Sequence, residues 1–418
     1  MLGLAAVLLL AQAGAGYSVL THEQIVDLLW EDRIQPMLKA RFPGITDADL
    51  KQAHAYAYGG SLVQDMGYYP FGNKYFSNIT HYVRTGDFVM ALVAQAQTAN
   101  EFAFGLGALA HYASDNDGHP MVNHTVAMEF PELRQKFGDS VTYADSPTAH
   151  IRAEFGFDMV QVAKNHYTSD RYHDFIGFEV SQSLLQRVFP QIYGIEFRDV
   201  VHDEDLAIGT FRHAVSQVIP EVTRVALLTH KDEIVADTPN AAEKKYLYYL
   251  SRTDYEREWG EKYRKPGLGT RILAAILKIF PKRGPFSGLN FKVPPPAAEN
   301  QFVESVDKTV KSYRIRLEEV QAGTLHLANT DCDTGNPTER GEYSLADRTY
   351  RRLLHDLAKS KFKQVSPELQ ENVLGFYSGA KATASAATEA KPTPKERRRT
   401  REELRRLRAA TAATSAAK

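Results

Sequence analysis

The sequence predicts an all-α fold, with a multi-helix domain followed by a helical C-terminal extension. Apolar residues recur three or four positions apart over long stretches, which is the period of an amphipathic helix. Alternating runs bounded by turns, which would indicate strands, are scarce. With 43% hydrophobic and 24% charged residues, the composition is that of a globular protein.

The first residues have the pattern of a signal peptide. Residues 1–16 contain an apolar core followed by small residues, although no basic residue precedes the core. This stretch is shorter than the roughly 20 apolar residues that a membrane-spanning helix needs. We therefore expect an exported protein, periplasmic or secreted, with cleavage after Ala15 or after Gly16. Cleavage after Gly16 would make Tyr17 the N-terminal residue.

Residues 17–235 are interpreted as the main domain. Thr21 suits the N-cap position of its first helix. Helical spacing of apolar residues predicts helices over residues 22–30, from residue 47, and over residues 87–118, 146–166 and 205–230. The stretch 66–80 is rich in Gly, Tyr and Asn and is expected to form a long loop.

The rest of the chain divides into a helical extension, residues 236–377, and a basic Ala-rich tail, residues 378–418. Helical segments are expected over residues 304–321 and 344–374, after a Pro-rich linker at residues 293–298. Residues 267–283 form a basic amphipathic stretch that would pack on the domain or lie on a membrane surface. The tail is expected to be disordered, apart from a short helix near residues 402–408.

The single cysteine, Cys332, excludes both a disulfide framework within the chain and a zinc site built from several cysteines. A metal site must therefore use His, Asp, Glu or backbone groups. The net charge of −1 gives no indication of a nucleic-acid-binding protein. Basic residues instead gather at the C-terminal end, where residues 380–418 hold 11 Lys and Arg against 4 Glu.

The strongest candidate for a site is the run His111-x3-Asp115-x3-His119. A spacing of four residues stacks side chains on one face of a helix, so three potential zinc ligands would point the same way. Pro120 is expected to end this helix near His119. A single His-x3-carboxylate pair is weak evidence, since such pairs also arise by chance, but the triple is rarer.

Further candidate ligands would allow a site with more than one zinc ion. A second pair on a predicted helix is His150 with Glu154. Asp65 and His81 bracket the Tyr-rich stretch, and His22 follows closely on the expected N-terminus. The complete candidate set is the α-amine of Tyr17 with His22, Asp65, His81, His111, Asp115, His119, His150 and Glu154.

This arrangement resembles the zinc-dependent phospholipase C family, its relatives the single-strand-specific nucleases, and the N-terminal domain of glycosylphosphatidylinositol-specific phospholipase D. The resemblance covers residues 17–235 and implies an all-helical fold with three zinc ions. In that superfamily an aromatic N-terminal residue, usually Trp, binds one zinc through its amine and carbonyl. Here Tyr17 occupies that place, at the spacing from His22 that the nucleases show.

The resemblance also implies how the ligands divide. Tyr17, His22 and Asp115 would hold one zinc. Asp65, His81 and His111 would hold a second, with Asp115 bridging the two. His119, His150 and Glu154 would hold the third.

Two departures from the family pattern concern the third zinc. In the phospholipase C enzymes and the nucleases, the third His follows the helix Asp by six residues, and here that position is Met121. The four-residue spacing of His119 is similar to the phospholipase D-like branch. His124 remains a competing candidate.

The resemblance implies a zinc-dependent phosphodiester hydrolase, in which Asp65 would also orient or deprotonate the attacking water. Phospholipase C-like action on phospholipids, with possible peripheral membrane contact, is the leading hypothesis, and no specific protein partner can be inferred. A single-strand-specific nuclease on the same site, or a non-catalytic zinc-binding envelope protein, is the alternative. Aromatic residues of the stretch 66–80 would line the substrate site or serve only in packing: Tyr68, Tyr69, Phe71, Tyr75 and Phe76.

Overall fold

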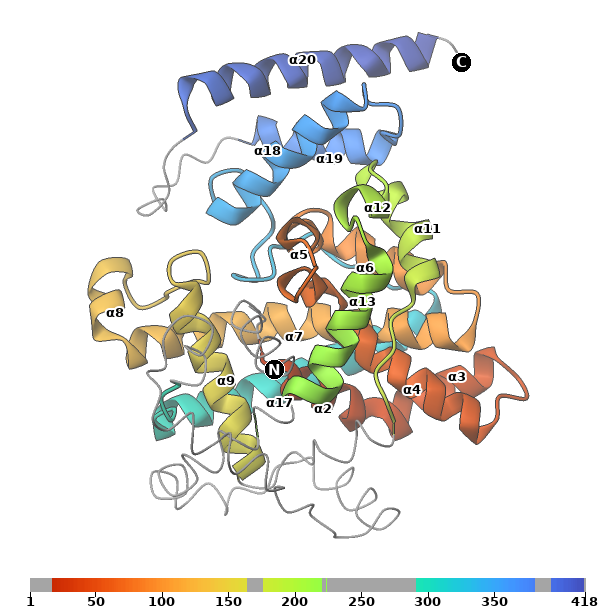
Figure 1. Cartoon of the computed structure of the whole chain (residues 1–418), viewed down its shortest axis with the longest axis vertical. Helices are drawn as coiled ribbons and strands as arrows, with labels where there is room; N and C mark the ends of the chain where they lie inside the picture. The colour runs from red at the N-terminus through yellow and green to blue at the C-terminus, as the bar shows by residue number, and fades with distance from the viewer. Residues whose placement is uncertain (1–16, 164–175, 220–222, 224–290, 380–391, 417–418) are drawn as a thin grey trace.

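A computed structural model describes residues 17–163, 176–219, 223, 291–379 and 392–416 of the chain (Figure 1). Within these ranges every regular element is a helix, and one isolated antiparallel bridge joins Thr330 to Pro337. The prediction of an all-α fold is therefore confirmed.

The helices before residue 164 surround the candidate site. They are α2 (Val19–Leu29), η1 (Trp30–Ile34), α3 (Gln35–Arg41), α4 (Asp47–Ser61), η2 (Val63–Tyr68), α5 (Lys74–Tyr82), α6 (Thr85–Ala94), α7 (Ala99–Glu129), α8 (Pro131–Phe137) and α9 (Pro147–Ala163). Those that follow are α11 (Gln182–Tyr193), α12 (Phe197–Val200), α13 (Glu204–His213), η3 (Ala214–Val218), α17 (Pro296–Ala322), α18 (Ser344–Lys359), α19 (Pro367–Ser378) and α20 (Pro394–Ala416).

The helix α7 runs through the centre of this arrangement (Figure 1). It begins after Thr98, whose side chain accepts a hydrogen bond from the backbone N–H of Glu101 at 3.2 Å and so caps the helix. It continues for 31 residues and passes through Pro120. The prediction that Pro120 ends the helix near His119 is wrong, because the buried residues on both sides hold the helix together by tertiary packing.

Two glycines allow α4 and α7 to approach each other backbone to backbone. A Cβ atom at Gly60 would lie 2.0 Å from the carbonyl oxygen of Phe104. One at Gly107 would lie 2.0 Å from the carbonyl oxygen of Ala57. Larger residues would therefore force the helices apart. The close approach brings the end of α4 against the middle of α7, where the candidate ligands begin.

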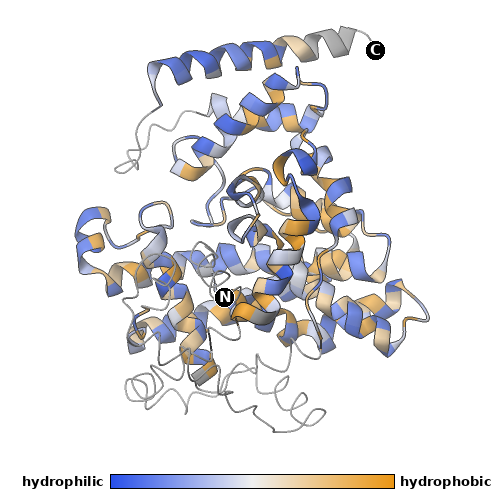
Figure 2. Cartoon of the chain, viewed as in Figure 1, coloured by the Kyte–Doolittle hydropathy of each residue, from blue (hydrophilic) through white to orange (hydrophobic). Residues whose placement is uncertain are grey.

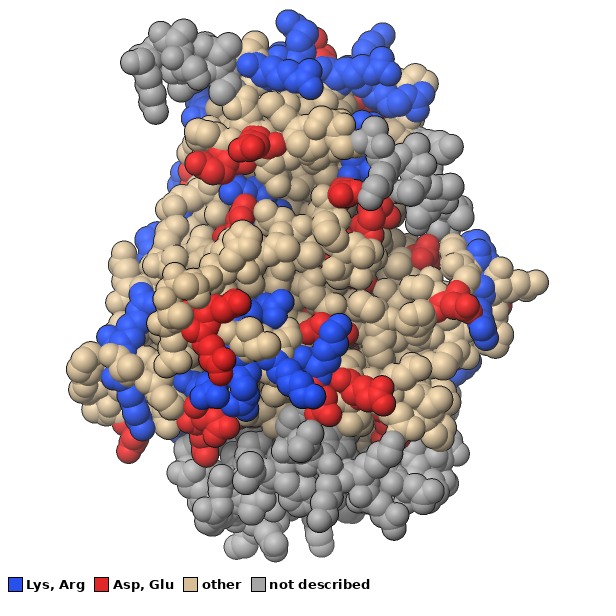
Figure 3. Space-filling model, turned by 180° about the vertical axis from the view of Figure 1, so that it is seen from behind, with Lys and Arg blue, Asp and Glu red and all other residues tan. Residues whose placement is uncertain are grey.

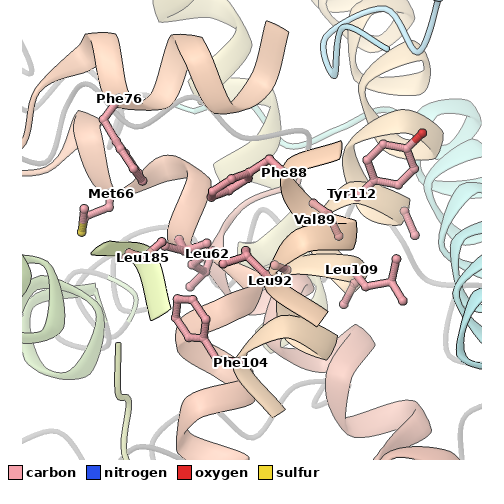
Figure 4. Close-up of a cluster of buried hydrophobic side chains, with 14 of the residues drawn as sticks. Leu62, Met66, Phe76, Phe88, Val89, Leu92, Phe104, Leu109, Tyr112 and Leu185 are labelled. Atoms are coloured by element: carbon pink, nitrogen blue, oxygen red, sulfur yellow. The ribbon is translucent and has the colours of Figure 1, made fainter. Parts of the chain in front are cut away.

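Apolar side chains from several helices fill the space beside α7. Figure 4 shows Leu62, Phe76, Phe88 and Phe104 directed into one cluster, and all four are fully buried. Phe76 also stacks on Phe189 of α11, with ring centroids 5.7 Å apart. Each such burial stabilises the fold by about 1.5–3 kcal/mol, so this cluster anchors η2, α5 and α6 to α7.

The described C-terminal helices pack against the domain. Tyr313 of α17 donates its hydroxyl hydrogen to the carbonyl oxygen of Leu106 on α7 at 2.9 Å. The helix α20 lies across α18 at one end of the molecule (Figure 1) and is hydrophilic along most of its length (Figure 2). Its Leu407 is nevertheless only 1% exposed. α20 contains the short helix expected near residues 402–408 and extends beyond it in both directions, so the expectation of disorder does not hold for the rest of α20.

Other element boundaries also differ from the predictions. The expected helix over residues 87–118 is two helices, since α6 ends at Ala94 and α7 begins at Ala99. The stretch 66–80, expected as a loop, contains the end of η2 and most of α5. The expected helix over residues 205–230 is described as α13 and η3, and its later part lies largely outside the described residues.

The expected signal peptide, residues 1–16, and the basic amphipathic stretch, residues 267–283, lie outside the described residues. Of the helices that the structure describes, none combines the length and the apolar character that crossing a bilayer requires.

Candidate metal centre

The candidate ligands of α7 lie on one buried face. His111 and Asp115 are completely buried, and His119 is 1% exposed. Neighbouring helices bring further candidates to this face: His22 from α2, Asp65 from η2, His81 from α5, and His150 and Glu154 from α9. Their ligand atoms form three buried groups, namely His22–His111–Asp115, Asp65–His81–His111 and His119–His150–Glu154, each with its atoms within 4.8 Å of one another.

Hydrogen bonds fix the protonation of His81 and His111. Nδ1 of His81 lies 2.7 Å from the carbonyl oxygen of Ser77, and Nδ1 of His111 lies 2.9 Å from that of Ser61. A carbonyl oxygen can only accept, so each Nδ1 carries a hydrogen, and in the neutral form of the ring the lone pair lies on Nε2. The two Nε2 atoms face each other at 3.2 Å. A cation between them would satisfy both lone pairs.

Most distances between the candidate ligand atoms match those around a zinc ion, and one is shorter. Asp115 Oδ2 lies 3.0 Å from His111 Nε2 and 3.3 Å from His81 Nε2. Asp65 Oδ1 lies 3.5 Å from His81 Nε2. Atoms bound at about 2.0–2.2 Å around a tetrahedral ion are roughly 3.3–3.6 Å apart. The second oxygen of Asp115 lies 3.5 Å from His22 Nε2, so this carboxylate faces two groups at once.

Several buried atoms at the centre make no hydrogen bond to any part of the chain that the structure describes. They are Nε2 of His22, Nε2 of His119 and Oδ1 of Asp65. A buried polar atom without a partner destabilises a protein by about 1–3 kcal/mol. Zinc prefers imidazole nitrogen and carboxylate oxygen, so the donor set fits this metal and zinc would satisfy these atoms.

In the third group, the hydrogen-bond pattern identifies the ligand atom of His150. Asn123 donates through Nδ2 to the carbonyl oxygen of Asp333 at 2.9 Å, so its Oδ1 is the acceptor that lies 2.8 Å from His150 Nε2. Nε2 of His150 therefore carries the hydrogen, and Nδ1, 2.7 Å from Glu154 Oε1, is left to bind a metal. The ring of His119 stacks on that of His150, with centroids 5.2 Å apart.

Burial controls the charges of these groups. Desolvation lowers the pKa of His22 to about 3, with a further contribution from His111, and it lowers the pKa of His150 to about 4. Both rings are therefore neutral at pH 7, which is the form that binds zinc. Burial raises the pKa of Asp65 well above its ordinary value. Burial also opposes ionisation of Asp115, but the adjacent His111 holds its pKa well below the ordinary range.

Tyr17 lies against the same centre. It is 1% exposed, and its hydroxyl donates to Ser305 Oγ of α17 at 2.8 Å. Its ring centroid lies 6.1 Å from that of His22. A Cβ atom at Gly118 would lie 2.7 Å from the Tyr17 ring, so the glycine leaves room for this ring beside the ligands of α7. Gly16, whose removal an α-amine ligand requires, lies outside the described residues.

The competing candidate His124 lies in different surroundings. It is exposed at the surface, and its Nδ1 lies 2.6 Å from the carbonyl oxygen of Asp139. It belongs to none of the three groups. His119, in contrast, lies with Nε2 3.8 Å from Asp115 Oδ2.

The aromatic residues of the stretch 66–80 do not act as one wall. The ring centroid of Tyr68 lies 6.3 Å from that of His81, so this residue borders the metal centre. Phe71 is 64% exposed and points away from the interior. The remaining residues are buried packing residues: Tyr69, Tyr75 and Phe76.

No sequence pattern selects Asp333, which lies between α17 and α18. This residue is 3% exposed, and its Oδ1 lies 3.6 Å from His119 Nε2. Its local signal is weak, because Asp331 and Asp333 flank Cys332 just before Gly335, a composition typical of turns. Asp333 contacts α7 through the hydrogen bond from Asn123, and these two residues are 210 positions apart in the sequence. No local sequence pattern predicts such a contact.

The helical fold and the three buried His and carboxylate groups define a centre of the kind found in zinc-dependent hydrolases. Residues 21–200 match the model of the zinc-dependent phospholipase C family. This part of the chain is therefore similar to that family, which supports the resemblance seen in the sequence. No curated protein and no solved structure gives a significant match.

Proposed function

We propose that the chain is a phospholipase C-like hydrolase that acts on phospholipids and carries three zinc ions. The ligands in this proposal are the α-amine of Tyr17 with His22, Asp65, His81, His111, Asp115, His119, His150 and Glu154. The observation that carries it is the position of Asp115, whose completely buried carboxylate contacts His22, His81, His111 and His119.

When bound, zinc supplies a Lewis acid for phosphoryl oxygens and activates water at neutral pH. The chain must hold neutral imidazoles and carboxylates at fixed positions, and the carbonyl oxygens of Ser61 and Ser77 do this for His111 and His81. To Asp65 we assign the alignment and deprotonation of the attacking water. Its position supports this role, because the buried Asp65 Oδ1 faces the second ligand group, 3.5 Å from His81 Nε2.

Phospholipid is favoured over single-stranded nucleic acid for two reasons. Residues 21–200 match the model of the zinc-dependent phospholipase C family. In addition, a nuclease needs aromatic faces on which bases can stack. Aromatic side chains near the metal centre are buried, including Tyr68, Tyr82 and Tyr143.

An arginine face on α20 supports peripheral contact with an anionic membrane. It consists of four exposed residues at helical spacing, Arg398, Arg401, Arg405 and Arg408. Figure 3 shows Lys and Arg gathered over this end of the molecule. Arg401 also lines a cavity of about 500 Å³ together with Arg340, Arg351 and Arg397. Such groups of cations attract anionic lipid headgroups.

Export belongs to the same proposal. Removal of residues 1–16 would free the α-amine of Tyr17, and the buried position of Tyr17 beside His22 supports a role for it. We expect the purified protein, periplasmic or secreted, to begin at Tyr17, as the mass of its N-terminal peptide would reveal.

Metal analysis of matched histidine variants tests the metal centre. His111→Ala and His150→Ala should each lose zinc and lower the hydrolysis of phosphatidylcholine by about 100-fold or more, since removing even an outer-shell partner often costs 10- to 100-fold. His124→Ala, on the same helix but outside the groups, should retain both. Unchanged zinc in the first two variants would refute the assignment.

The substrate is tested with the wild-type protein. It should release a phosphorylated headgroup from phosphatidylcholine and leave single-stranded DNA intact. Cleavage of DNA alone would establish the nuclease alternative. Zinc binding without cleavage of phosphatidylcholine, DNA or a chromogenic phosphodiester would leave a zinc-binding envelope protein.

A further inference from the structure

The segment Thr330–Tyr343, here called the metal-facing segment, is fastened to the elements that carry the candidate ligands. The backbone N–H of Cys332 donates to the carbonyl oxygen of His81 at 3.1 Å. Gly335 has φ +72°, and a Cβ atom there would lie 2.8 Å from the backbone oxygen of Asn116 on α7. The segment therefore touches both α5 and α7.

Asp333 is the residue of this segment that reaches the metal centre. Its Oδ2 accepts hydrogen bonds from the hydroxyls of Tyr82, at 2.9 Å, and Tyr343. Its Oδ1 lies 3.6 Å from Nε2 of His119. Its backbone oxygen accepts from Asn123, the residue that orients His150. One carboxylate oxygen is thus held by two phenols, while the other faces the third ligand group.

The surroundings of Asp333 lack a compensating positive charge. Within the described ranges, the ion-pair partner of this buried carboxylate is His119, and no Lys or Arg nitrogen lies within 4.0 Å of it. A buried carboxylate without a cation is strongly destabilising. A divalent ion next to His119 would supply the missing charge.

The distance itself agrees with shared coordination. At 3.6 Å, Asp333 Oδ1 and His119 Nε2 are too far apart for a hydrogen bond and at the separation of two ligands of one zinc ion. His119 Nε2 also makes no hydrogen bond to any described residue.

We propose that Asp333 is a further ligand of the metal ion held by His119, His150 and Glu154, so that the C-terminal part of the chain completes this site. The inference rests on the zinc centre proposed above and adds a ligand from outside the segment that matches the family. Four protein ligands close the coordination of a zinc ion, which is typical of ions that stabilise structure. Zinc binding and docking of the metal-facing segment are then coupled, and each strengthens the other.

Zinc content after dialysis against a chelator tests this ligand. Asp333→Asn should lose about one zinc ion per chain relative to the wild type, because a neutral amide binds zinc weakly. Asp331→Asn is the matched control, since Asp331 is equally buried but its Oδ1 accepts a hydrogen bond from the Thr334 N–H at 2.8 Å, within the same segment. This control should retain the wild-type zinc content.

A milder variant keeps the test decisive if Asp333→Asn fails to fold. Tyr343→Phe removes one hydroxyl from Oδ2 and leaves the carboxylate in place, so the affinity for one zinc ion should fall about 10- to 100-fold. The zinc-induced rise in melting temperature should shrink correspondingly. Wild-type zinc affinity in both variants would overturn the proposal. Unchanged zinc content combined with faster hydrolysis would also overturn it, because Asp333 would then hinder hydrolysis and not bind the metal.

The zinc content of the variants distinguishes an error in this inference from an error in the proposed zinc centre. If His150→Ala loses zinc while Asp333→Asn keeps it, the centre stands and Asp333 is not a ligand. If the wild-type protein contains no zinc, both proposals fail.

Discussion

Burial lowers the pKa values of His22 and His150 in the metal centre, and this has a consequence for the protein without metal. His150 has a pKa of about 4 in the folded protein because of burial, against about 6.5 in the unfolded chain. As the pH falls from 6.5 to 4, the unfolded chain takes up a proton that the folded protein does not. Stability therefore decreases as the pH falls, by about 3 kcal/mol in total for this residue, with no further loss below pH 4.

Urea unfolding of the metal-free protein at pH 7, 5.5 and 4.5 measures this effect. His150→Gln cannot take up the proton, so the difference in unfolding free energy between wild type and variant should narrow towards pH 4.5. His124→Gln, which alters an exposed ring, should show a constant difference. A pH-independent difference for His150→Gln would contradict the assignment of a buried neutral imidazole.

The spacing of residues along the sequence predicted some ligands of this centre, but it could not predict Asp333. His111, Asp115 and His119 were grouped because a helix fixes the direction of every fourth side chain. The structure brings the other candidates from α2, η2, α5 and α9 to the same face. Asp333 depends on a long connection whose path is set by packing, not by local periodicity.

Among the elements, the contact between α4 and α7 positions the second ligand group. Ser61 at the end of α4 orients His111, and Asp65 follows in η2. Gly107→Ala would place a Cβ atom 2.0 Å from the carbonyl oxygen of Ala57. Because backbone cannot move aside easily, we expect a loss of about 1–3 kcal/mol in unfolding free energy and weaker zinc binding.

Gly209→Ala in α13 is the matched control. No heavy atom lies within 4 Å of a Cβ atom at Gly209, and this helix position is exposed. Alanine should be neutral or stabilise the helix by up to about 1 kcal/mol. Thermal unfolding and zinc titration compare the variants, and an equal response of both would mean that the α4–α7 approach does not position the ligands.

Helices were predicted better than their ends. Amphipathic spacing located α2, α4, α7, α9 and α13, but it missed α11 and also α5, which was expected as a loop. Tertiary packing carried α7 through Pro120, and α6 ends at Ala94. The tail shows the same limit. Its composition predicted disorder around a short helix near residues 402–408, whereas α20 spans Pro394–Ala416 and its Leu407 and Glu403 are buried.

At the scale of the whole molecule, the described helices place the metal centre in the interior and concentrate basic residues on α20 (Figures 1 and 3). The near-neutral net charge of the chain conceals this separation. A hydrolase of membrane phospholipids would use such a surface to hold itself at the membrane, while catalysis depends on a different part of the molecule.

The arginine face should therefore control membrane binding without affecting the chemistry. Arg398→Gln combined with Arg408→Gln should weaken binding to vesicles that contain phosphatidylglycerol by about 30-fold, because each arginine near an anionic surface contributes about 1 kcal/mol. Lys39→Gln combined with Lys136→Gln removes the same charge from exposed positions on α3 and α8 and should have little effect. Vesicle sedimentation measures binding, and hydrolysis of a soluble chromogenic phosphodiester should be unchanged in both variants. If both double variants weakened vesicle binding equally, only the net charge would determine binding and α20 would not be the membrane-binding surface.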